Sequence, residues 1–411
     1  MPNRVLYIST DGMTEALGQS QVLAYLRVLA TYGYQFHLIS FEKPEYYEQE
    51  RAHVLGLLEG TGIHWHPLPY HNRPPILGTL RDQRAGWQLV RSLWAQHPFQ
   101  LVHCRSYLPA LLGLRAQKKW GARFIFDMRG WWPDQRLESG AWRSPLFRPV
   151  YRYFKQKERL FFSKSDLTVS LTYAGRDEIV RLGYRLPEDI LVVPTCVDFR
   201  SFPPPTLADR LAIRAQYGIS AEQYVVINSG SLGGNYPVRE VFDIFQGIRL
   251  QRPDAHLLLL TKTPAEEAQA AYRAYGLPDQ AVTVASVRYH QVHRYLAAAD
   301  VGLFVYRPLY SSLGSSPTKL GEYWAMGLPV LSTSGVGDVD QILATHPGSG
   351  VSMPLGLSPA EIAPYAARLE AERAGAATLR QYAVQYYSLE AGCQKYSEEY
   401  ARMLALPPRR T

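Results

Sequence analysis

The segment SSPTKLGEYWAMGLPV, in the last third of the chain, carries the most informative polar residues. Ser316 followed by Pro317 is typical of a helix start, with a hydroxyl at the N-cap and proline at the first helical position. The free N–H groups and dipole of such a start favour an anion. Lys319 could give a point charge to phosphate, and Glu322 would share a helix face with Thr318. The pattern predicts a diphosphate at the helix start and a ribose on Glu322, unless Lys319 and Glu322 are merely a surface pair.

The glycine-rich loop GSLGGN follows an apolar run in the same half of the chain. Gly230 and Ser231 begin this loop. Because glycine has no Cβ, backbone N–H groups there could approach phosphate oxygens closely. A tight turn without a ligand is the alternative interpretation.

Two candidates lie at the ends of strand-like runs in the first half of the chain. Gly18 stands in the loop after the first run, where it would let a sugar or an acceptor approach the backbone. His103 lies near the end of a later run, VHCRSY, and is predicted to point into a ligand cleft. The alternatives are an ordinary strand-to-helix turn for Gly18 and a hydrogen-bonded core histidine for His103.

The segment FDMRGWWPD places charged and aromatic residues where another strand-like run ends. Asp127 and Arg129 come at the strand end, and an arginine there can bind a carboxylate or phosphate with two parallel hydrogen bonds. Trp131 and Trp132 follow in a loop, where indole rings could stack on sugars. The alternative is that the two tryptophans fill a core beneath the loop.

A basic aromatic segment follows, with seven Lys or Arg residues against one Glu over residues 143–164. Aromatic residues recur in it at helical spacing. A basic amphipathic helix of this kind can lie on an anionic membrane. A helix at the edge of a domain, with a solvated basic face, is the alternative.

These candidates must be positioned by a series of strands that alternate with helical segments. The first series of predicted strands is 5–10, 36–40, 101–104, 124–127, 167–171 and 190–194, and the second is 225–229, 256–261, 282–286, 301–305 and 329–332. Apolar strands that alternate with helices predict parallel sheets covered on both faces. We therefore expect two doubly wound, Rossmann-like α/β domains facing a central cleft.

The domain boundary is expected in the proline-rich residues 194–206, because three consecutive prolines cannot lie inside a helix or a central strand. The N-terminal domain would cover residues 1–198 and the C-terminal domain residues 206–383. Residues from about 381 to 406 read as one long amphipathic helix that packs across the seam. Residues 384–411 are assigned to the first domain.

Composition narrows the class of protein. The 411 residues carry a formal net charge of +8, which favours anionic ligands such as nucleotide diphosphates, acidic glycans or lipids. No apolar run approaches the roughly 18 residues that a membrane span needs, and no signal peptide is seen. The three cysteines are too far apart to suggest a zinc site or disulfides, and no nucleic-acid-binding motif is present.

The register Glu322, Ala325, Gly327, Pro329, Val330 resembles the nucleotide-sugar signature of the family 4 retaining glycosyltransferases. The resemblance extends over nearly the whole chain and implies the GT-B fold. In that family the glutamate binds the ribose, and the backbone just before it binds the diphosphate. A histidine of the family contacts the donor sugar near the strand end occupied here by Asp127 and Arg129.

The sequence departs from the family at the charged positions. A second family glutamate would fall at Gly314, and the family's basic pair would fall at Ser231 and Tyr236. The residues that could neutralise the diphosphate instead are Lys319, Lys262, Arg239 and Arg288.

The resemblance implies transfer of a sugar from a nucleotide diphosphate sugar to an acceptor hydroxyl, with retention, in glycan, polysaccharide or glycolipid synthesis. Asp127, Arg129 and His103 would be the catalytic candidates. No metal or other cofactor is expected, and the acceptor would be a glycan or a lipid-linked molecule. We expect a cytoplasmic protein that contacts the inner face of an anionic membrane and binds no nucleic acid. The alternatives are a nucleotide-sugar epimerase of the same fold and a catalytically weak nucleotide-sugar-binding protein.

Overall fold

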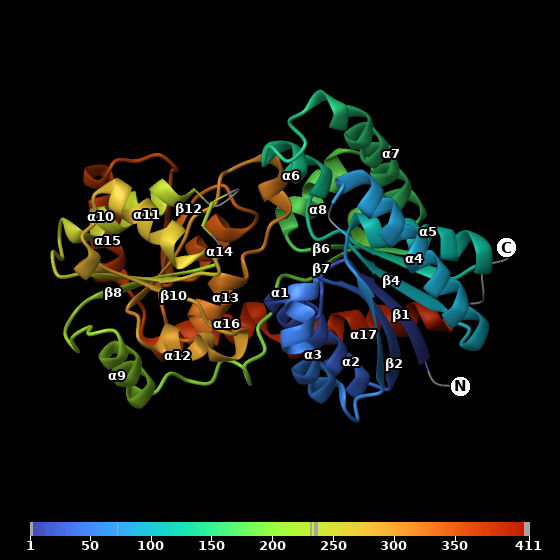
Figure 1. The fold of residues 1–411 in the computed structure, drawn as a ribbon, viewed down its shortest axis with the longest axis horizontal. Coiled ribbons are helices and arrows are strands. Elements are labelled where there is room, and N and C mark those ends of the chain that lie inside the picture. The colour runs from blue at the N-terminus through green and yellow to red at the C-terminus, as the bar shows by residue number, and fades with distance from the viewer. Residues whose placement is uncertain (1–2, 72, 231, 234–236, 407–411) are drawn as a thin grey trace. The chain divides into compact units, whose positions relative to one another are not determined.

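A computed structural model describes residues 3–71, 73–230, 232–233 and 237–406 of the chain. The chain forms two compact units (Figure 1). Unit 1 comprises Met1–Pro194 and Leu389–Thr411, and unit 2 comprises Thr195–Ser388. The chain thus leaves unit 1 at the first proline of the proline-rich segment and returns to it for the last helix.

Unit 1 contains a seven-stranded parallel sheet in the order β3-β2-β1-β4-β5-β6-β7. Its strands are β1 (Asn3–Ser9), β2 (Tyr34–Glu42), β3 (Ile63–Pro69), β4 (Leu101–Arg105), β5 (Arg123–Asp127), β6 (Leu167–Ser170) and β7 (Ile190–Val192). Its helices are α1 (Ala16–Gly18), a π-helical turn (Gln19–Leu23), α2 (Ala24–Thr31), α3 (Pro44–Leu58), α4 (Pro75–Gln96), α5 (Tyr107–Trp120), α6 (Trp132–Glu138), α7 (Arg148–Lys164), α8 (Tyr173–Arg181) and α17 (Leu389–Ala405).

Unit 2 contains a six-stranded parallel sheet in the order β10-β9-β8-β11-β12-β13. Its strands are β8 (Val225–Ser229), β9 (His256–Leu260), β10 (Val282–Ala285), β11 (Val301–Phe304), β12 (Val330–Thr333) and β13 (Gly350–Met353). Its helices are α9 (Leu207–Gln216), α10 (Val238–Arg249), α11 (Ala265–Tyr275), α12 (Val292–Ala297), α13 (Thr318–Ala325), α14 (Val339–Thr345), α15 (Pro359–Glu372) and α16 (Ala376–Tyr387).

The apolar strands pack on both faces, as the sequence predicts. In β8, Val225 and Ile227 join one buried cluster, whereas Val226 between them joins the cluster on the opposite face. Successive side chains of a strand point to opposite faces, so a strand covered by helices on both sides must be apolar throughout. The prediction of two doubly wound α/β sheets is confirmed.

Both sheets reverse their strand order at one point. The reversal lies between β1 and β4 in unit 1 and between β8 and β11 in unit 2. Helices that follow the two strands at such a point lie on opposite faces, which leaves a crevice beyond the carboxyl ends of the strands where ligands bind. These two places are the structural candidates for a site.

The prediction of one long C-terminal helix is wrong. Ser388 is extended, with φ −62° and ψ 125°, and separates α16 from α17. α16 packs on α13 within unit 2, whereas α17 packs on α2 within unit 1. The continuous apolar pattern hid this break, because each helix buries a stripe of its own.

Two strands escaped the sequence analysis. β3 lies at one edge of the first sheet and β13 at one edge of the second. β3 reads HWHP in its middle, and its side chains are mostly only partly buried. Edge strands are paired on one side only, so their sequences carry a weaker apolar signal than central strands.

Candidate functional site

The start of α13 lies in the carboxyl-edge region of the second sheet. The helix begins at Thr318, and Pro317 stands at the cap position with no side-chain hydrogen bond to the first turn. The predicted capping role of Ser316 is wrong, because its hydroxyl lies 3.0 Å from the Thr195 hydroxyl and also receives the Thr195 N–H. Among the described residues no side-chain cap is found at this helix start, so its N–H groups keep their tendency to attract an anion.

Lys319 reaches from the first turn of α13 to the end of β8. A Cβ placed on Gly230 would lie 2.8 Å from Nζ of Lys319, which shows how closely the ammonium group approaches the backbone at the end of β8. Gly230 also has φ +124°, a conformation that other residues rarely adopt. The ammonium group lies 5.5 Å from the centre of the Tyr306 ring, just after β11. Lys319 therefore carries a positive charge to the place where β8 and β11 diverge.

Tyr323 contacts the ends of β8 and β11 at the same reversal of strand order. Its hydroxyl accepts the Ser229 N–H at 3.0 Å, lies 2.9 Å from the Ser229 hydroxyl and donates to the Leu303 carbonyl at 3.2 Å. A side chain at Gly302 would collide with the Tyr323 ring, because a Cβ there would lie 2.2 Å from it. One buried phenol thus holds the ends of β8 and β11 and the helix α13 together.

Glu322 is buried, with 8% of its surface exposed, and its Oε1 receives the Tyr289 hydroxyl at 3.5 Å. Burial raises the pKa of Glu322 to about 7, although Lys319 opposes this shift. Burial likewise lowers the pKa of Lys319 to about 8, against the influence of Glu322. These groups are not the exposed pair of the alternative interpretation, and perturbed pairs of this kind are typical of functional sites.

The other predicted donor-binding residues lie in the same region or outside the description. Lys262 and Arg288 are exposed and follow β9 and β10, the strands next to β8 on one side of the sheet. Gly314 is buried at the end of a short 3-10 turn. Ser231 and Tyr236 lie outside the described residues. The contribution of Tyr289 had no sequence signal, because an isolated tyrosine after a strand is common.

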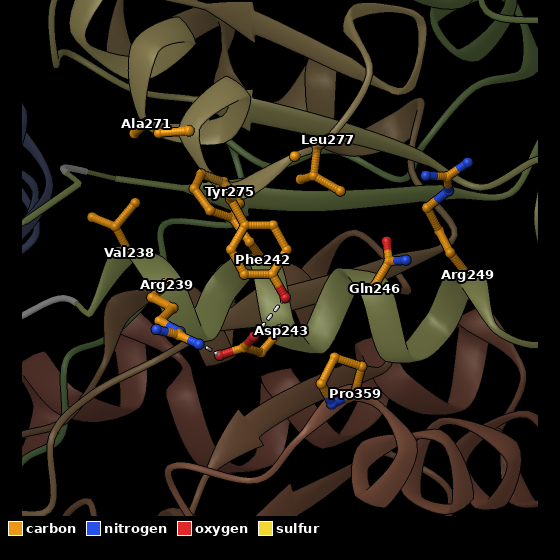
Figure 2. Close-up of a pocket in the computed structure, with 12 residues that line it drawn as sticks. Val238, Arg239, Phe242, Asp243, Gln246, Arg249, Ala271, Tyr275, Leu277 and Pro359 are labelled. Carbon is orange, nitrogen blue, oxygen red and sulfur yellow. Dashed lines mark hydrogen bonds and ion pairs between the residues drawn. The ribbon is translucent and has the colours of Figure 1, made fainter.

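Arg239 lines a different feature, an open groove of about 780 Å³ between α10 and α11 (Figure 2). The side chain is 82% exposed, and its Nε lies 3.8 Å from Asp243, which also accepts the Tyr275 hydroxyl. The groove shares no lining residue with the α13 start. Arg239 is therefore less well placed than Lys319 to bind a diphosphate at that helix.

In unit 1, charged residues gather at the reversal of strand order. Arg105 at the end of β4 pairs in register with Asp127 at the end of β5. Nε of Arg105 donates to Asp11, in the loop after β1, at 2.7 Å. Asp127 lies 3.9 Å from Arg105 and 3.8 Å from Arg129. Burial favours the neutral acid, but Arg129, His103 and Arg105 outweigh it and hold the pKa of Asp127 below its usual value.

The backbone is strained at this edge. Ser106 has φ +72° and Arg129 has φ +59°, and they are the only non-glycine residues with positive φ in the described part of the chain. Ser106 combines that φ with ψ −176°, a region used almost only by glycine. Strain of this kind costs on the order of 1–3 kcal/mol and concentrates at functional sites. Ser106 and Asp11 are site candidates that the sequence did not reveal.

His103 lies two residues before the end of β4 and is buried within unit 1. Its side chain is 2% exposed, and Nδ1 lies 2.6 Å from the Tyr400 hydroxyl on α17. Nε2 lies 3.5 Å from Asp127. The imidazole is enclosed, so its contact with the edge runs through Asp127.

The two tryptophans pack inward. Trp131 is 1% exposed, with Phe162 at 6.0 Å between ring centroids and the Lys155 ammonium 5.3 Å from its ring centre. Trp132 packs at 4.9 Å on Phe154. The buried Trp131 ring offers no exposed face for stacking on a sugar, whereas Trp132, the first residue of α6, is only partly buried.

Gly18 serves the chain itself. A Cβ at Gly18 would lie 2.0 Å from the Gly12 carbonyl oxygen, so glycine permits a close approach to the preceding loop. Glu42 holds that loop, because its carboxylate accepts the N–H groups of Met13 at 2.8 Å and Thr14 at 3.2 Å. Gly18 therefore has a packing role, and its contact with a sugar or acceptor stays a prediction.

The buried carboxylate of Glu322 gives a prediction about stability. Its pKa is raised on folding, so an ionised Glu322 destabilises the fold above about pH 7 and has no such effect below about pH 4.5, where both states are protonated. We expect Glu322→Gln to raise the free energy of unfolding at pH 8 by about 1–3 kcal/mol. Urea titrations at pH 8 and pH 4.5 measure this, and the gain should vanish at the lower pH. Glu266→Gln, at an exposed position, is the control.

Two family models match the chain. A family model described as a glycosyl transferase 4-like domain matches residues 18–196, and one described as glycosyl transferases group 1 matches residues 223–369. A search of curated protein sequences gave no significant match.

Solved structures resemble the whole chain. Sucrose-phosphate synthase from Thermosynechococcus elongatus has a TM-score of 0.72 and 15% identity, over 98% of this chain and 99% of that one. HepE of Anabaena, in complex with UDP and glucose, has a TM-score of 0.69 and 14% identity, over 98% and 100%. WaaG, a glycosyltransferase involved in lipopolysaccharide biosynthesis, has a TM-score of 0.65 and 17% identity, over 96% and 99%.

A putative UDP-N-acetylglucosamine 2-epimerase from Listeria monocytogenes is also similar, with a TM-score of 0.61 and 12% identity, over 100% of this chain and 99% of that one. Likeness at this level of identity shows the two-domain GT-B fold, which transferases and this epimerase share. The family models favour a transferase over an epimerase, because both models describe glycosyl transferases and their matches together cover most of both units. The chain belongs to the GT-B glycosyltransferases that join a glycosyl transferase 4-like domain to a group 1 domain.

Proposed function

We propose that this glycosyltransferase takes its sugar from a nucleotide diphosphate sugar bound by unit 2 and transfers it, with retention, to a glycan or lipid-linked acceptor hydroxyl. The observation that carries the proposal is the convergence of Lys319, Gly230 and Glu322 at the reversal between β8 and β11. The similar structure of HepE, in complex with UDP and glucose, supports this class of donor.

The geometry suggests a division of tasks. The uncapped start of α13 and the Lys319 ammonium supply positive potential for a diphosphate. Glu322 lies one turn into the helix, where its carboxylate can accept the two ribose hydroxyls. As the bond to the sugar breaks, negative charge grows on the leaving diphosphate, and a preorganised cation stabilises it. Lys319 thereby replaces the basic pair that the family places at Ser231 and Tyr236.

Unit 1 would supply the acceptor side. Arg129 and Ser106 are held in strained conformations at the carboxyl edge, beside the anionic Asp127. Arg129 is suited to an anionic or hydroxyl-rich group of the acceptor or the sugar. We propose that the reaction proceeds without a bound metal, with the helix start and Lys319 as the electrophilic groups.

A nucleotide-sugar panel tests the function. Incubation with UDP- and GDP-sugars should release the free nucleotide diphosphate slowly, even without an acceptor. Glu322→Ala should weaken binding by about 10- to 100-fold, because a buried carboxylate that accepts two hydroxyl groups is lost. An isomerised sugar without release would indicate an epimerase, and unchanged calorimetric affinity of Glu322→Ala would refute the ribose role.

The two perturbed pKa values predict how donor affinity depends on pH. Glu322 must be ionised, which favours pH above about 7, and Lys319 must be charged, which favours pH below about 8. We expect the affinity for UDP-glucose to peak in this window and to fall about tenfold for each further pH unit on either side. A nucleotide sugar is the better probe, because the terminal phosphate of free UDP itself titrates near pH 6.

Calorimetry from pH 5.5 to 9.5 measures this dependence. Glu322→Gln should remove the acid limb, and Lys319→Met should remove the alkaline limb while lowering affinity throughout. A flat profile in the unmodified protein would contradict these roles for both residues.

We further propose that α7 brings the protein to an anionic membrane. In the described part of the chain no helix is long and apolar enough to span a bilayer. The aromatic stripe of α7 is not available to lipid, since Phe154 and Phe161 are buried in unit 1. The exposed side carries Arg152, Arg159 and the apolar Leu160, and Leu146 just before the helix is 82% exposed.

Vesicle sedimentation tests this contact. At low salt the protein should pellet with phosphatidylglycerol vesicles and not with phosphatidylcholine vesicles, because each basic residue near an anionic surface contributes about 1 kcal/mol. Charge reversal of Arg152 and Arg159 to Glu should abolish binding. Reversal of Arg84 and Arg91, exposed on α4 with the same spacing, is the matched control. Equal loss in both double variants would show only non-specific attraction and overturn the proposal.

A further inference from the structure

The C-terminal helix α17 packs on one face of the first sheet. Through His103 it contacts the carboxyl edge of that sheet, where Arg105 and Asp127 lie. It packs against α2 and β4. Tyr7, His103 and Asp127 point to this same face, because Tyr7 pairs with His103 across β1 and β4, and Arg105, two residues on, pairs with Asp127. Residues at the end of the sequence therefore contact the strand that carries the candidate His103.

His103 is held between two groups with opposite hydrogen-bonding needs. Nδ1 lies 2.6 Å from the Tyr400 hydroxyl, and Nε2 lies 3.5 Å from Oδ2 of Asp127. Tyr7 and Tyr396 close the ring on its sides, with centroid distances of 4.5 and 5.5 Å. Burial lowers the pKa of His103 more than Asp127 raises it, so the imidazole is neutral and one nitrogen must donate while the other accepts.

The charges around the ring select the tautomer. Asp127 is anionic, with a pKa held below its usual value despite burial. An anion beside Nε2 favours a proton on that nitrogen, which leaves Nδ1 as the acceptor. Burial raises the pKa of Tyr400 well above its usual value, so its hydroxyl keeps the proton that Nδ1 can accept. Tyr400, His103 and Asp127 therefore lie in a row, with Nδ1 of His103 at hydrogen-bonding distance from Tyr400 and Nε2 at ion-pair distance from Asp127.

Asp127 is the member of this row of residues that lies at the carboxyl edge of the first sheet. Its Oδ2 is 3.9 Å from Arg105, and its Oδ1 is 3.8 Å from Arg129. The carboxylate therefore lies within ion-pair distance of both guanidinium groups. Arg105 in turn holds Asp11 in the loop after β1.

We propose that Tyr400 is a positioning residue of the transferase: its hydroxyl fixes the Nε2–H tautomer of His103, which orients Asp127 between Arg105 and Arg129. Packing alone does not require this hydroxyl, since the ring contacts Tyr34 at 5.2 Å and Phe36 at 6.4 Å, and phenylalanine would fill the same space. The inference rests on the proposed function for its kinetic part only, because the tautomer is a property of the free protein.

Selective ¹⁵N-histidine labelling of the full chain gives the first test. His103, identified by the signal that is lost in His103→Gln, should be the Nε2–H tautomer in the unmodified protein. In Tyr400→Phe, Nδ1 loses its donor and becomes easier to protonate, so we expect a mixture of tautomers and a higher pKa of His103. An unchanged tautomer and pKa in Tyr400→Phe would overturn the proposal, whatever the enzyme does with a donor.

Kinetics gives the second test. Tyr400→Phe should lower kcat by on the order of 10- to 100-fold, with KM for the nucleotide sugar changed less than about twofold, because the donor is held by unit 2. The acid limb of the kcat profile should move to higher pH. Tyr396→Phe is the control, one turn earlier on α17, because in the described part of the chain its hydroxyl makes no hydrogen bond to His103.

A double-mutant cycle separates positioning from loss of fold. If Tyr400 acts through His103, Tyr400→Phe should cost little further activity in a His103→Gln background. Additive losses would show that Tyr400 acts on stability alone and would refute the relay. Failure of the unmodified protein to use any nucleotide sugar would instead reject the proposed function, and the tautomer measurement would still decide the role of Tyr400.

Discussion

The reversal of strand order in each parallel sheet is the constraint on which the rest of this protein depends. β8 and β11 pair in the sheet as far as Asn228 and Leu303, and beyond that point they send their chains to opposite faces, where a further contact ties their ends. Tyr323 makes that tie through Ser229 and the Leu303 carbonyl. The same connection delivers the start of α13 and its Lys319 to the crevice. The position of the Lys319 charge is therefore a consequence of how Tyr323 holds the ends of β8 and β11.

Both units contain buried ionisable side chains, and the surroundings shift the pKa values of these groups in different ways. In unit 2, Glu322 and Lys319 have pKa values shifted toward their neutral forms, mainly by burial. In unit 1, Asp127 keeps its charge despite burial, because two arginines and a histidine surround it. A site poised between charge states suits the binding and release of an anionic nucleotide. A site locked in one charge state suits the orientation of a partner.

Several aromatic residues pack inside unit 1, although the sequence predicts that they contact a sugar or a membrane. Trp131 and Trp132 follow a charged strand end, yet Trp131 is buried near Phe162, and the partly buried Trp132 packs on Phe154. The aromatic stripe of α7 likewise faces the core. Large aromatic side chains bury the most surface, so a loop that crosses a sheet edge can use them as anchors. The residues that keep partial exposure at this edge are then Arg129 and the strained Ser106.

The sequence by itself determined the alternation of strands and helices, the two sheets and the signature that places Glu322 on a helix, because these depend on periodicity and short spacings. It also nominated Lys319 and the edge residues Asp127 and Arg129. Only the tertiary structure decided that Ser316 bonds Thr195, that Gly18 packs on Gly12, and that Ser388 divides the last helix. It alone joined Asp11 to Arg105 and Tyr400 to His103. Those contacts link residues that are 94 and 297 positions apart, and no local pattern in the sequence encodes them.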